Sequence, residues 1–402
     1  MATCSTAPIL TMTQRRIPAV FMRGGTSKGV FFHAKDLPAD PGERERVLLR
    51  VVGSPDPYGK QIDGMGSATS STSKVVILSR SSRPGCDVDY LFGQVAIDRP
   101  FIDWSGNCGN LTAAVGPFAI SEAIVEAPAD GMATVRIWQV NTRKMIIAQV
   151  PMRRGEVVEE GDFELDGVTF PAAEIPITFI DPGGAEEGGD SALFPTGHLV
   201  DTLQVPGVGA VESTLINAGN PTVFIHANQV GLDGKELQKE VNGNATLLAA
   251  LEAIRAQGAV RMGVAKDLEE ASARKLHTPK VAFVSPPQSY IASNGKPVRE
   301  DEIGLTARIV SMGQLHHAMT GTGAVAIAAA AAIPGTLVHR VRRPNANVAR
   351  TVFGHPSGTL TVGAEVRQAD GQWMVTQVLM SRSARRLMEG WVRVPSAGSR
   401  ER

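Results

Sequence analysis

The chain has 402 residues, of which 43% are hydrophobic and 20% are charged, a composition typical of a globular protein rather than a disordered one. This length exceeds what one ordinary core organises, so we expect two domains of about 150–200 residues each. The 40 basic and 40 acidic side chains cancel, which argues against the basic excess of a duplex nucleic-acid binder.

Three cysteines, Cys4, Cys86 and Cys108, are an odd number at scattered spacings. They form neither a disulfide framework nor a C-x-x-C metal pair, so a reducing cytoplasm is the expected compartment. No charged region followed by a sustained apolar stretch opens the chain, so we expect no signal peptide, and Met12 is an alternative start. The apolar run 324–333 is too short to span a bilayer, which predicts a soluble protein without a membrane partner.

Alternating and β-branched runs, bounded by glycine, proline and aspartate, predict that strands dominate the chain. The expected strands are 17–22, 74–78, 87–97, 133–140, 144–150, 167–170, 214–225, 280–284, 306–310, 358–366 and 373–380. The expected helices are 41–52, 109–125, 234–257 and 322–333. Because helices and strands do not alternate regularly, an α+β fold with substantial antiparallel sheet is favoured over a doubly wound one.

Two segments, 106–120 and 319–333, share a pattern: each opens with a glycine-rich polar turn and continues into small apolar residues. A helix that is apolar on all sides must be buried all round. We therefore expect an internal pseudo-repeat in which each half supplies one enclosed helix. The acidic, glycine-rich segment 179–197 is the expected connection between the halves.

Cys108 lies in the sequence SGNCGNLTAAVG, where a loop is expected to turn into the first of these helices. The N–H groups and partial positive charge of a helix N-terminus favour a thiolate and also bind carboxylates. Flanking glycines let a ligand approach the backbone. The motif thus fits an acid or base beside an anion site, and equally a small buried cysteine near a loop.

Two further segments, MRGGTSKG (22–29) and GSATSSTSK (66–74), combine glycines, hydroxyls and a lysine beside expected strands. Such stretches suit carboxylate capture by backbone amides and hydroxyls. Lys74 enters an apolar strand, where desolvation lowers a lysine pKa and produces a base; the alternative is a solvent-facing strand end. His355, in the turn GHPSGTL (354–360), is expected to be a turn residue or a neighbour of the site.

Nucleotide and metal motifs are incomplete. Gly321, Gly323 and Ala326 fit the loose G-x-G-x-x-A pattern, but no acidic residue follows at the required distance. The adjacent histidines His316 and His317 are expected to point in different directions, as poor joint metal ligands. No metal or nucleotide cofactor is therefore indicated.

Several segments of the chain closely resemble the PrpF family, and the match extends from about residue 16 to residue 395. The segments are 22–32, 53–74, 104–120, 277–284, 311–319, 353–360 and 380–390. This resemblance implies a diaminopimelate-epimerase-like fold, with two pseudo-symmetric domains of mainly antiparallel strands wrapped around a central helix. The expected domains are 16–190 and 191–384, with a last strand near 385–397 returning to the first domain and the active site in the cleft between them.

Epimerases of this superfamily use two cysteines, one at each helix mouth. Here the resemblance places Cys108 at the first mouth and Thr320 at the second, so a symmetric two-thiol racemase is not expected. The family implies isomerisation of 2-methyl-trans-aconitate to the cis isomer in propionate catabolism, without a cofactor. Lys74 is then the principal base and Cys108 its partner acid or base. Expected substrate-binding residues are Thr26, Ser27, Ser70, Ser71, Thr72, Asn107, Gly109, Lys280, Ser311, Thr320 and Thr322.

Three other functions remain open from the sequence. A 4-oxalomesaconate tautomerase resembles this family through the same segments and acts on a related unsaturated tricarboxylate. A non-catalytic accessory protein of a dehydratase is an alternative of another class, but the presence of both Lys74 and Cys108 disfavours it. A nicotinamide-dependent dehydrogenase is a distant third. The sequence leaves open whether the protein is a homo-oligomer and whether it associates with a methylcitrate dehydratase.

Overall fold

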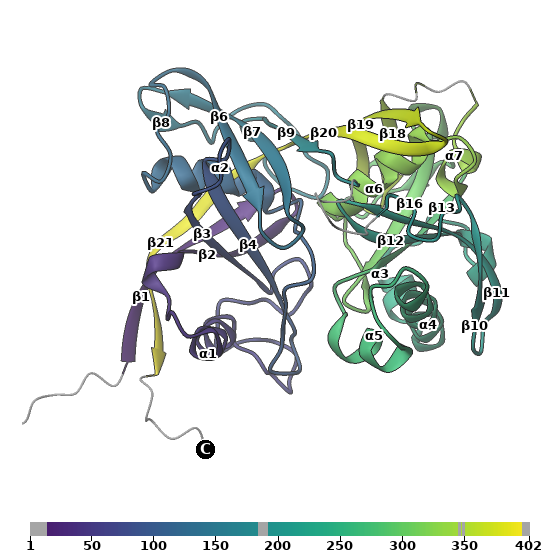
Figure 1. Ribbon diagram of the computed structural model, residues 1–402, viewed down its shortest axis with the longest axis horizontal. Helices are drawn as coiled ribbons and strands as arrows, with labels where there is room; N and C mark the ends of the chain where they lie inside the picture. Colours follow the sequence, from purple (N-terminus) through teal and green to yellow (C-terminus); the bar gives the residue numbers. More distant parts are fainter. Residues whose placement is uncertain (1–13, 184–191, 345–346, 348–349, 396–402) are drawn as a thin grey trace, which may run out of the picture.

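The structure, a computed structural model, describes residues 14–183, 192–344, 347 and 350–395. Cys4, the alternative start Met12 and part of the expected connection between the halves lie outside these residues. Figure 1 shows two lobes side by side, the N-terminal half of the chain in one and most of the C-terminal half in the other.

The N-terminal half is mostly sheet, with two α-helices among its described residues. Its helices are α1 (Pro41–Val52) and α2 (Thr112–Ser121), and a 3-10 turn, η1, spans Ala34–Asp36. Its strands are β1 (Gln14–Gly24), β2 (Ser27–His33), β3 (Lys74–Arg80), β4 (Val88–Val95), β5 (Ile102–Asp103), β6 (Gly131–Gln139), β7 (Lys144–Arg153), β8 (Glu156–Val157) and β9 (Ile175–Ile180).

The C-terminal half has more helix. Its helices are α3 (Gln238–Asn242), α4 (Ala245–Arg261), α5 (Leu268–Arg274), α6 (Gly321–Ala332) and α7 (Leu337–Val341), with 3-10 turns η2 (Ala227–Val230) and η3 (Glu300–Glu302). Its strands are β10 (Asp201–Val205), β11 (Gly209–Ala218), β12 (Asn220–His226), β13 (Lys280–Ser285), β14 (Tyr290–Ile291), β15 (Pro297–Val298), β16 (Leu305–Ser311), β17 (Gln314–Leu315), β18 (Thr351–His355), β19 (Gly358–Ala369), β20 (Gln372–Arg382) and β21 (Ala384–Pro395).

The strand pairings of the two halves follow the same order. In the N-terminal half, β1–β2 is antiparallel, β2–β3 parallel, β3–β4 antiparallel, β4–β6 parallel and β6–β7 antiparallel. In the C-terminal half, β11–β12, β12–β13, β13–β16, β16–β18 and β18–β19 repeat this series. The expected pseudo-symmetric α+β fold is therefore confirmed, and Lys74 and Lys280 open the equivalent strands β3 and β13.

The helices α2 and α6 are enclosed as their sequences predict. Every residue of α6 is buried, and so are the first eight residues of α2, Thr112–Ala119. Their side chains belong to one hydrophobic core that also includes residues from the sheets of both halves. Neither helix presents a charged face, because each is surrounded by protein on all sides. In Figure 1, α2 lies within one lobe and α6 within the other.

The last two long strands join the halves. β20 pairs with β19 on one side and with β9 of the N-terminal half on the other. β21 then pairs antiparallel with β1 along nearly its whole length, from Gln14 opposite Pro395 to Gly24 opposite Ala384. Figure 1 shows this return of the chain, which leaves the two ends of the described chain in the same lobe.

Local predictions differ from the structure at several places. The expected strand 167–170 is not a strand, because these residues form turns at the edge of a cavity. The expected strand 214–225 is two strands, since Gly219 adopts a positive φ of 73° between β11 and β12. The expected helix 234–257 is split, since Asn244 caps a new helix by accepting from Leu247 N at 3.0 Å. The expected helix 109–125 begins only at Thr112, after a tight turn.

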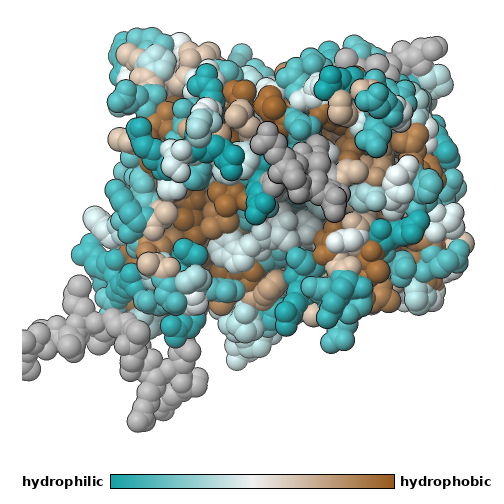
Figure 2. All heavy atoms as spheres, viewed as in Figure 1, coloured by the Kyte–Doolittle hydropathy of each residue, from teal (hydrophilic) through white to brown (hydrophobic). Residues whose placement is uncertain are grey.

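None of the helices in the described residues is long and apolar enough to cross a membrane. On the face shown in Figure 2, hydrophilic residues are common at the outer rims of the lobes, and apolar residues gather mainly toward their inner sides.

Candidate active site

A small cavity lies where the two enclosed helices begin. Residues of both halves line it, and they include lysines, histidines, hydroxyls and a cysteine but no Asp or Glu among the described residues. Predicted site residues on its wall are Ser27, Ser70, Lys74, Asn107, Cys108, Gly109, Lys280, Ser311, Thr320 and Thr322. A cavity of this composition suits an anionic ligand and proton transfer.

Cys108 lies in the turn that leads into α2. Its carbonyl oxygen accepts from Thr112 N at 3.0 Å and from the Tyr90 hydroxyl at 3.3 Å. Its Sγ accepts from Leu111 N at 3.5 Å. The thiol thus occupies the anion-binding position at a helix N-terminus, although the first helical residue lies four positions later.

Lys74 is buried at the start of β3, and its Nζ donates to Gln94 Oε1 at 2.6 Å. Its ammonium also lies 4.9 Å from the centre of the Phe92 ring. Burial lowers the pKa of Lys74, and the nearby Cys108 acts in the opposite direction. The lysine is therefore not a solvent-facing strand end but a desolvated amine beside a thiol, which favours the neutral form that acts as a base.

Lys280 occupies the equivalent position of the C-terminal half. Its Nζ donates to Ser311 Oγ at 3.1 Å and to His277 O at 3.3 Å, and lies 3.4 Å from His277 Nδ1. Burial, followed by the positive charge of Lys74, lowers the pKa of Lys280 to about 7. Two buried lysines thus share one cavity, and each faces a neutral acceptor on the adjacent antiparallel strand.

His277 connects Lys280 to the loop that carries Cys108. Its backbone N donates to Asp103 Oδ2 at 2.9 Å, and its Nε2 lies 3.3 Å from Asn107 O. Burial, followed by the charge of Lys280, holds the pKa of His277 well below its usual range, so the ring is neutral at pH 7. Its Nε2 also lies 3.3 Å from Asn220 Nδ2, and its Nδ1 faces Lys280 Nζ.

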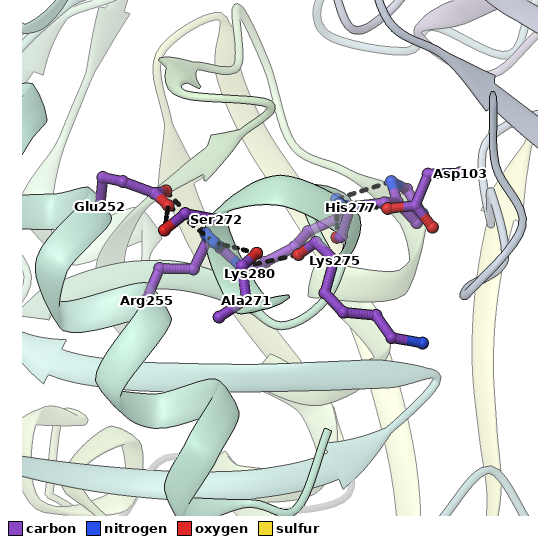
Figure 3. A network of polar contacts seen from close by, with 8 residues as sticks. All are labelled: Asp103, Glu252, Arg255, Ala271, Ser272, Lys275, His277 and Lys280. Atoms are coloured by element: carbon purple, nitrogen blue, oxygen red, sulfur yellow. Dashed lines mark hydrogen bonds and ion pairs between the residues drawn. The ribbon is translucent and has the colours of Figure 1, made fainter. Parts of the chain in front are cut away.

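The segment before β13 is anchored from behind by Arg255 of α4 (Figure 3). The buried Arg255 guanidinium forms a bidentate pair with Glu252 at 2.7 Å and donates to Ala271 O and Lys275 O. These bonds tie α4 and α5 to the chain that leads to His277 and Lys280. The position of Lys280 is therefore set by the helices on the outer side of the sheet as well as by β13.

The two helix mouths touch at a pair of glycines. A Cβ on Gly321 would lie 2.3 Å from the carbonyl carbon of Gly109, and one on Gly109 would lie 2.7 Å from the carbonyl carbon of Gly321. Thr320 caps α6, since its Oγ1 accepts from Gly323 N at 3.1 Å. Its hydroxyl thus has a capping role at the second mouth, and the first two residues of α6, Gly321 and Thr322, lie on the cavity wall.

Asn107 and Asn110 flank Cys108 and differ in their bonding. Asn107 Oδ1 is buried and has no hydrogen-bond partner among the described residues. Asn110 is held on both sides, because its Nδ2 donates to Met319 O at 3.1 Å and its Oδ1 accepts from Arg382 Nε at 3.1 Å. Burial lowers the pKa of Arg382 to about 10, so this guanidinium stays charged at pH 7. It places positive charge behind the loop.

Three predicted binding residues, Thr26, Ser71 and Thr72, do not line this cavity. They line a larger adjoining one of about 1710 Å³, which shares Ser27 with the site. Thr26 lies near the site, because its Oγ1 accepts from Asn110 Nδ2 at 2.9 Å. Thr72 lies farther away, since its Oγ1 bonds only with Thr69 in the described part of the chain.

The prediction for the two adjacent histidines is wrong. His316 and His317 do not point apart, because they lie in a bend rather than a regular element. Their rings stack with centres 4.7 Å apart, and Ser71 Oγ lies 3.0 Å from His316 Nε2 and 3.3 Å from His317 Nδ1. His355 lies outside the cavity wall, buried, with its Nδ1 accepting from Ser357 N. No cluster of three or more metal-ligating groups occurs among the described residues.

Sequence reasoning missed five residues of this region. The missed residues are Gln94, Asn110, His277, His316 and Arg382. Asn110 belongs to the same motif as Cys108, and the two histidines belong to motifs already singled out, so a closer inspection of those motifs would have found them. Arg382 lies in the segment 380–390 that was also singled out, whereas the role of Gln94 depends on its pairing with Lys74 across strands.

The chain is similar to several known proteins. The family described as "PrpF protein" matches residues 14–395. A relative from Cupriavidus necator, a 2-methyl-aconitate isomerase, is 60% identical over 390 residues, covering 95% of this chain and 98% of its own. A crystal structure of a methylitaconate-delta-isomerase is 39% identical, with a TM-score of 0.74, and covers 97% of this chain and 100% of its own.

A more distant structural match supports the fold alone. A hydroxyproline epimerase from Agrobacterium vitis is 12% identical and superimposes with a TM-score of 0.56 over 97% of this chain and 94% of its own. The chain therefore shares the fold of these epimerases, and its close relatives are isomerases. It belongs to the PrpF family.

Proposed function

We propose that the protein converts 2-methyl-trans-aconitate to 2-methyl-cis-aconitate, and also acts on trans-aconitate, by allylic proton transfer without a cofactor. The observation that carries the proposal is the single cavity in which Lys74 and Cys108 meet two helix N-termini without any carboxylate side chain. The similarity to a 2-methyl-aconitate isomerase over nearly the whole chain supports the same substrate.

The chemistry follows from the groups present. A C–H bond next to a carboxylate and conjugated through a C=C bond is acidified, because the resulting carbanion spreads into a dienolate. Neutral Lys74 takes this proton and becomes an ammonium, with Cys108 as its partner acid or base. A proton returned at an allylic carbon shifts the double bond, and rotation or a second shift changes the alkene geometry.

Substrate carboxylates need donors that the cavity supplies. The first N–H groups of α6, on Gly321 and Thr322, have no acceptor within their helix. Together with Gly109 and the hydroxyls of Ser27 and Ser311, they form an anion site on the cavity wall. The same donors stabilise the dienolate oxygens as charge develops there.

The partners and compartment follow from the same reasoning. The substrate is a small unsaturated tricarboxylate, supplied by a dehydratase of the methylcitrate pathway of propionate catabolism, and the reducing compartment expected from cysteine usage is the cytoplasm. We further propose the domain division 16–190 and 191–384, with β21 added to the first domain through its pairing with β1.

Proton NMR in D₂O tests the function directly. The protein is incubated with 2-methyl-trans-aconitate and with trans-aconitate, and Lys74→Ala and Cys108→Ser variants run in parallel. Matched controls are Lys266→Ala, a lysine whose side chain is 77% exposed, and Cys86→Ser, a cysteine outside the cavity. We expect the deuterated cis isomer with the wild type and both controls, and its loss in both site variants.

Other outcomes reject the proposal in distinct ways. No exchange and no isomer with either compound would exclude this substrate class, and 4-oxalomesaconate would then test the tautomerase alternative. Full activity of Lys74→Ala would show that the base lies elsewhere. A wild type without turnover on any of the three compounds would favour a non-catalytic accessory protein.

A further inference from the structure

Lys74 and Lys280 occupy equivalent positions in the two pseudo-symmetric halves of the fold. Lys74 opens β3 and lies opposite Gln94 in the β3–β4 register. Lys280 opens β13, and the β13–β16 register, with Val281 opposite Val310, continues to Lys280 opposite Ser311. Each lysine is thus buried at the same point of its half and bonds to the residue across from it. The two amines enter one cavity from opposite halves.

We propose that Lys280 is the second proton-transfer residue of the isomerase and returns a proton to the dienolate from the C-terminal half. This inference rests on the function proposed above. Cys108 then remains the partner of Lys74 at the first carbon. The proposal gives Lys280 a proton-transfer step in the reaction, whereas the sequence predicted only that Lys280 binds substrate.

The other candidates in the C-terminal half are already engaged. Thr320 uses its hydroxyl oxygen to cap α6. His277 is bonded on both sides, through Nε2 to Asn107 O and through Nδ1 facing Lys280. His316 accepts from Ala318 N at its Nδ1 and contacts Ser71 at its Nε2. Of the titratable groups that this half contributes to the described cavity wall, only Lys280 combines a flexible stem with exchangeable protons.

The two lysines differ in their immediate neighbours. Lys280 Nζ lies within 3.4 Å of His277 Nδ1, His277 O and Ser311 Oγ, whereas Lys74 Nζ donates to Gln94 and lies beside the Cys108 thiol. No carboxylate lies on the cavity wall to balance two charges, so repulsion disfavours protonating both amines at once. With Lys74 as the base of the proposed function, Lys280 is the donor.

The proton balance of the reaction then closes. Lys74 removes the allylic proton and becomes an ammonium, leaving the electron pair in the dienolate. A C–H bond forms at the far allylic carbon with a proton from Lys280, which becomes neutral. Before the next turnover, Lys74 releases a proton to solvent and Lys280 takes one up. The reverse reaction uses the two amines in exchanged roles.

Deuterium exchange and isomer formation, measured separately, test the assignment. In D₂O, Lys280→Met should still exchange the first allylic proton of 2-methyl-trans-aconitate, while isomer formation falls by about 100-fold or more. Lys280→Arg keeps a positive charge but cannot release its proton near neutral pH, so it should not restore isomerisation. Lys266→Met is the control for an exposed lysine, and circular dichroism checks that each variant is folded.

Several results would overturn the assignment. An equal fall of exchange and isomer formation in Lys280→Met, or rescue by Lys280→Arg, would reduce Lys280 to a carboxylate anchor. The first turnover of the wild type in D₂O is a further test. If the product carries the proton of the substrate at its new C–H bond, a single base moves that proton from one carbon to the other. A wild type that neither exchanges nor isomerises would instead refute the proposed function itself.

Discussion

Replacing Gly321 by alanine tests whether contact between the two helix mouths positions Cys108, the cysteine that we propose takes part in proton transfer. The new Cβ would lie 2.3 Å from the carbonyl carbon of Gly109 and 2.5 Å from Asn110 N. Ordinary van der Waals contact begins near 3.4 Å, so backbone atoms beside Cys108 must retreat by about 1 Å. Because these contacts are backbone on backbone, no side-chain rotation relieves them.

The expected effect has two parts. Overpacking costs about 1–3 kcal/mol, and the better helix propensity of alanine offsets up to about 1 kcal/mol of it, so the free energy of unfolding should fall by about 0–3 kcal/mol. A displacement of about 1 Å at a catalytic group lowers activity by about 100-fold. Activity should therefore fall far more than stability.

The assay combines urea unfolding with isomer formation followed by NMR. Gly42→Ala is the matched control, since Gly42 also lies in the first turn of a helix and a Cβ there would meet only Asp40 Oδ1 at 3.5 Å. This control should keep full activity and equal or higher stability. A Gly321→Ala protein as active as the wild type would refute the view that the two helix mouths position Cys108 through direct contact.

Two further predictions concern the buried lysines. Gln94→Leu removes the acceptor that lies 2.6 Å from Lys74 Nζ, and this loss lowers the pKa of Lys74 further. The acidic limb of the pH profile of kcat/KM should therefore move to lower pH. An unmoved limb would show that another group controls it. The pKa of Lys280 is about 7 in the folded protein and about 10.4 in an unfolded chain. Between these two pH values the unfolded state binds more protons than the folded state. The free energy of unfolding therefore rises with pH in this range, by up to about 1.4 kcal/mol per pH unit. Urea unfolding at several pH values from 7 to 10 should show that Lys280→Met lacks this part of the slope, and parallel curves for the two proteins would contradict the lowered pKa.

Much of the architecture could be predicted from local patterns. The two all-apolar segments require enclosed helices, because nothing on their surfaces interacts well with water, and α2 and α6 are buried accordingly. Alternation in β6 predicts a strand with one buried face, which the structure shows. Where a pattern was short, as in 167–170, the prediction was wrong, since the strand propensity of Val168, Thr169 and Phe170 does not outweigh the turn at Gly167, which adopts a positive φ of 95°.

The composition of the site was partly readable in the same way. Cys108 among glycines and Lys74 at the start of an apolar strand point to a thiol and a desolvated amine, because these residue types are unusual in such settings. The sequence by itself therefore determined the chemical groups available for catalysis and the buried helices that carry anion-binding ends.

Only the tertiary structure decided which groups meet. Lys280 is 206 positions from Lys74 in the sequence, and it shares the cavity because two halves with the same strand order face each other. Arg382 reaches Asn110, 272 positions away, only because β20 runs between the halves. The lowered pKa of each lysine arises from burial and the charges around it, which depend on packing in space rather than on neighbours in the chain.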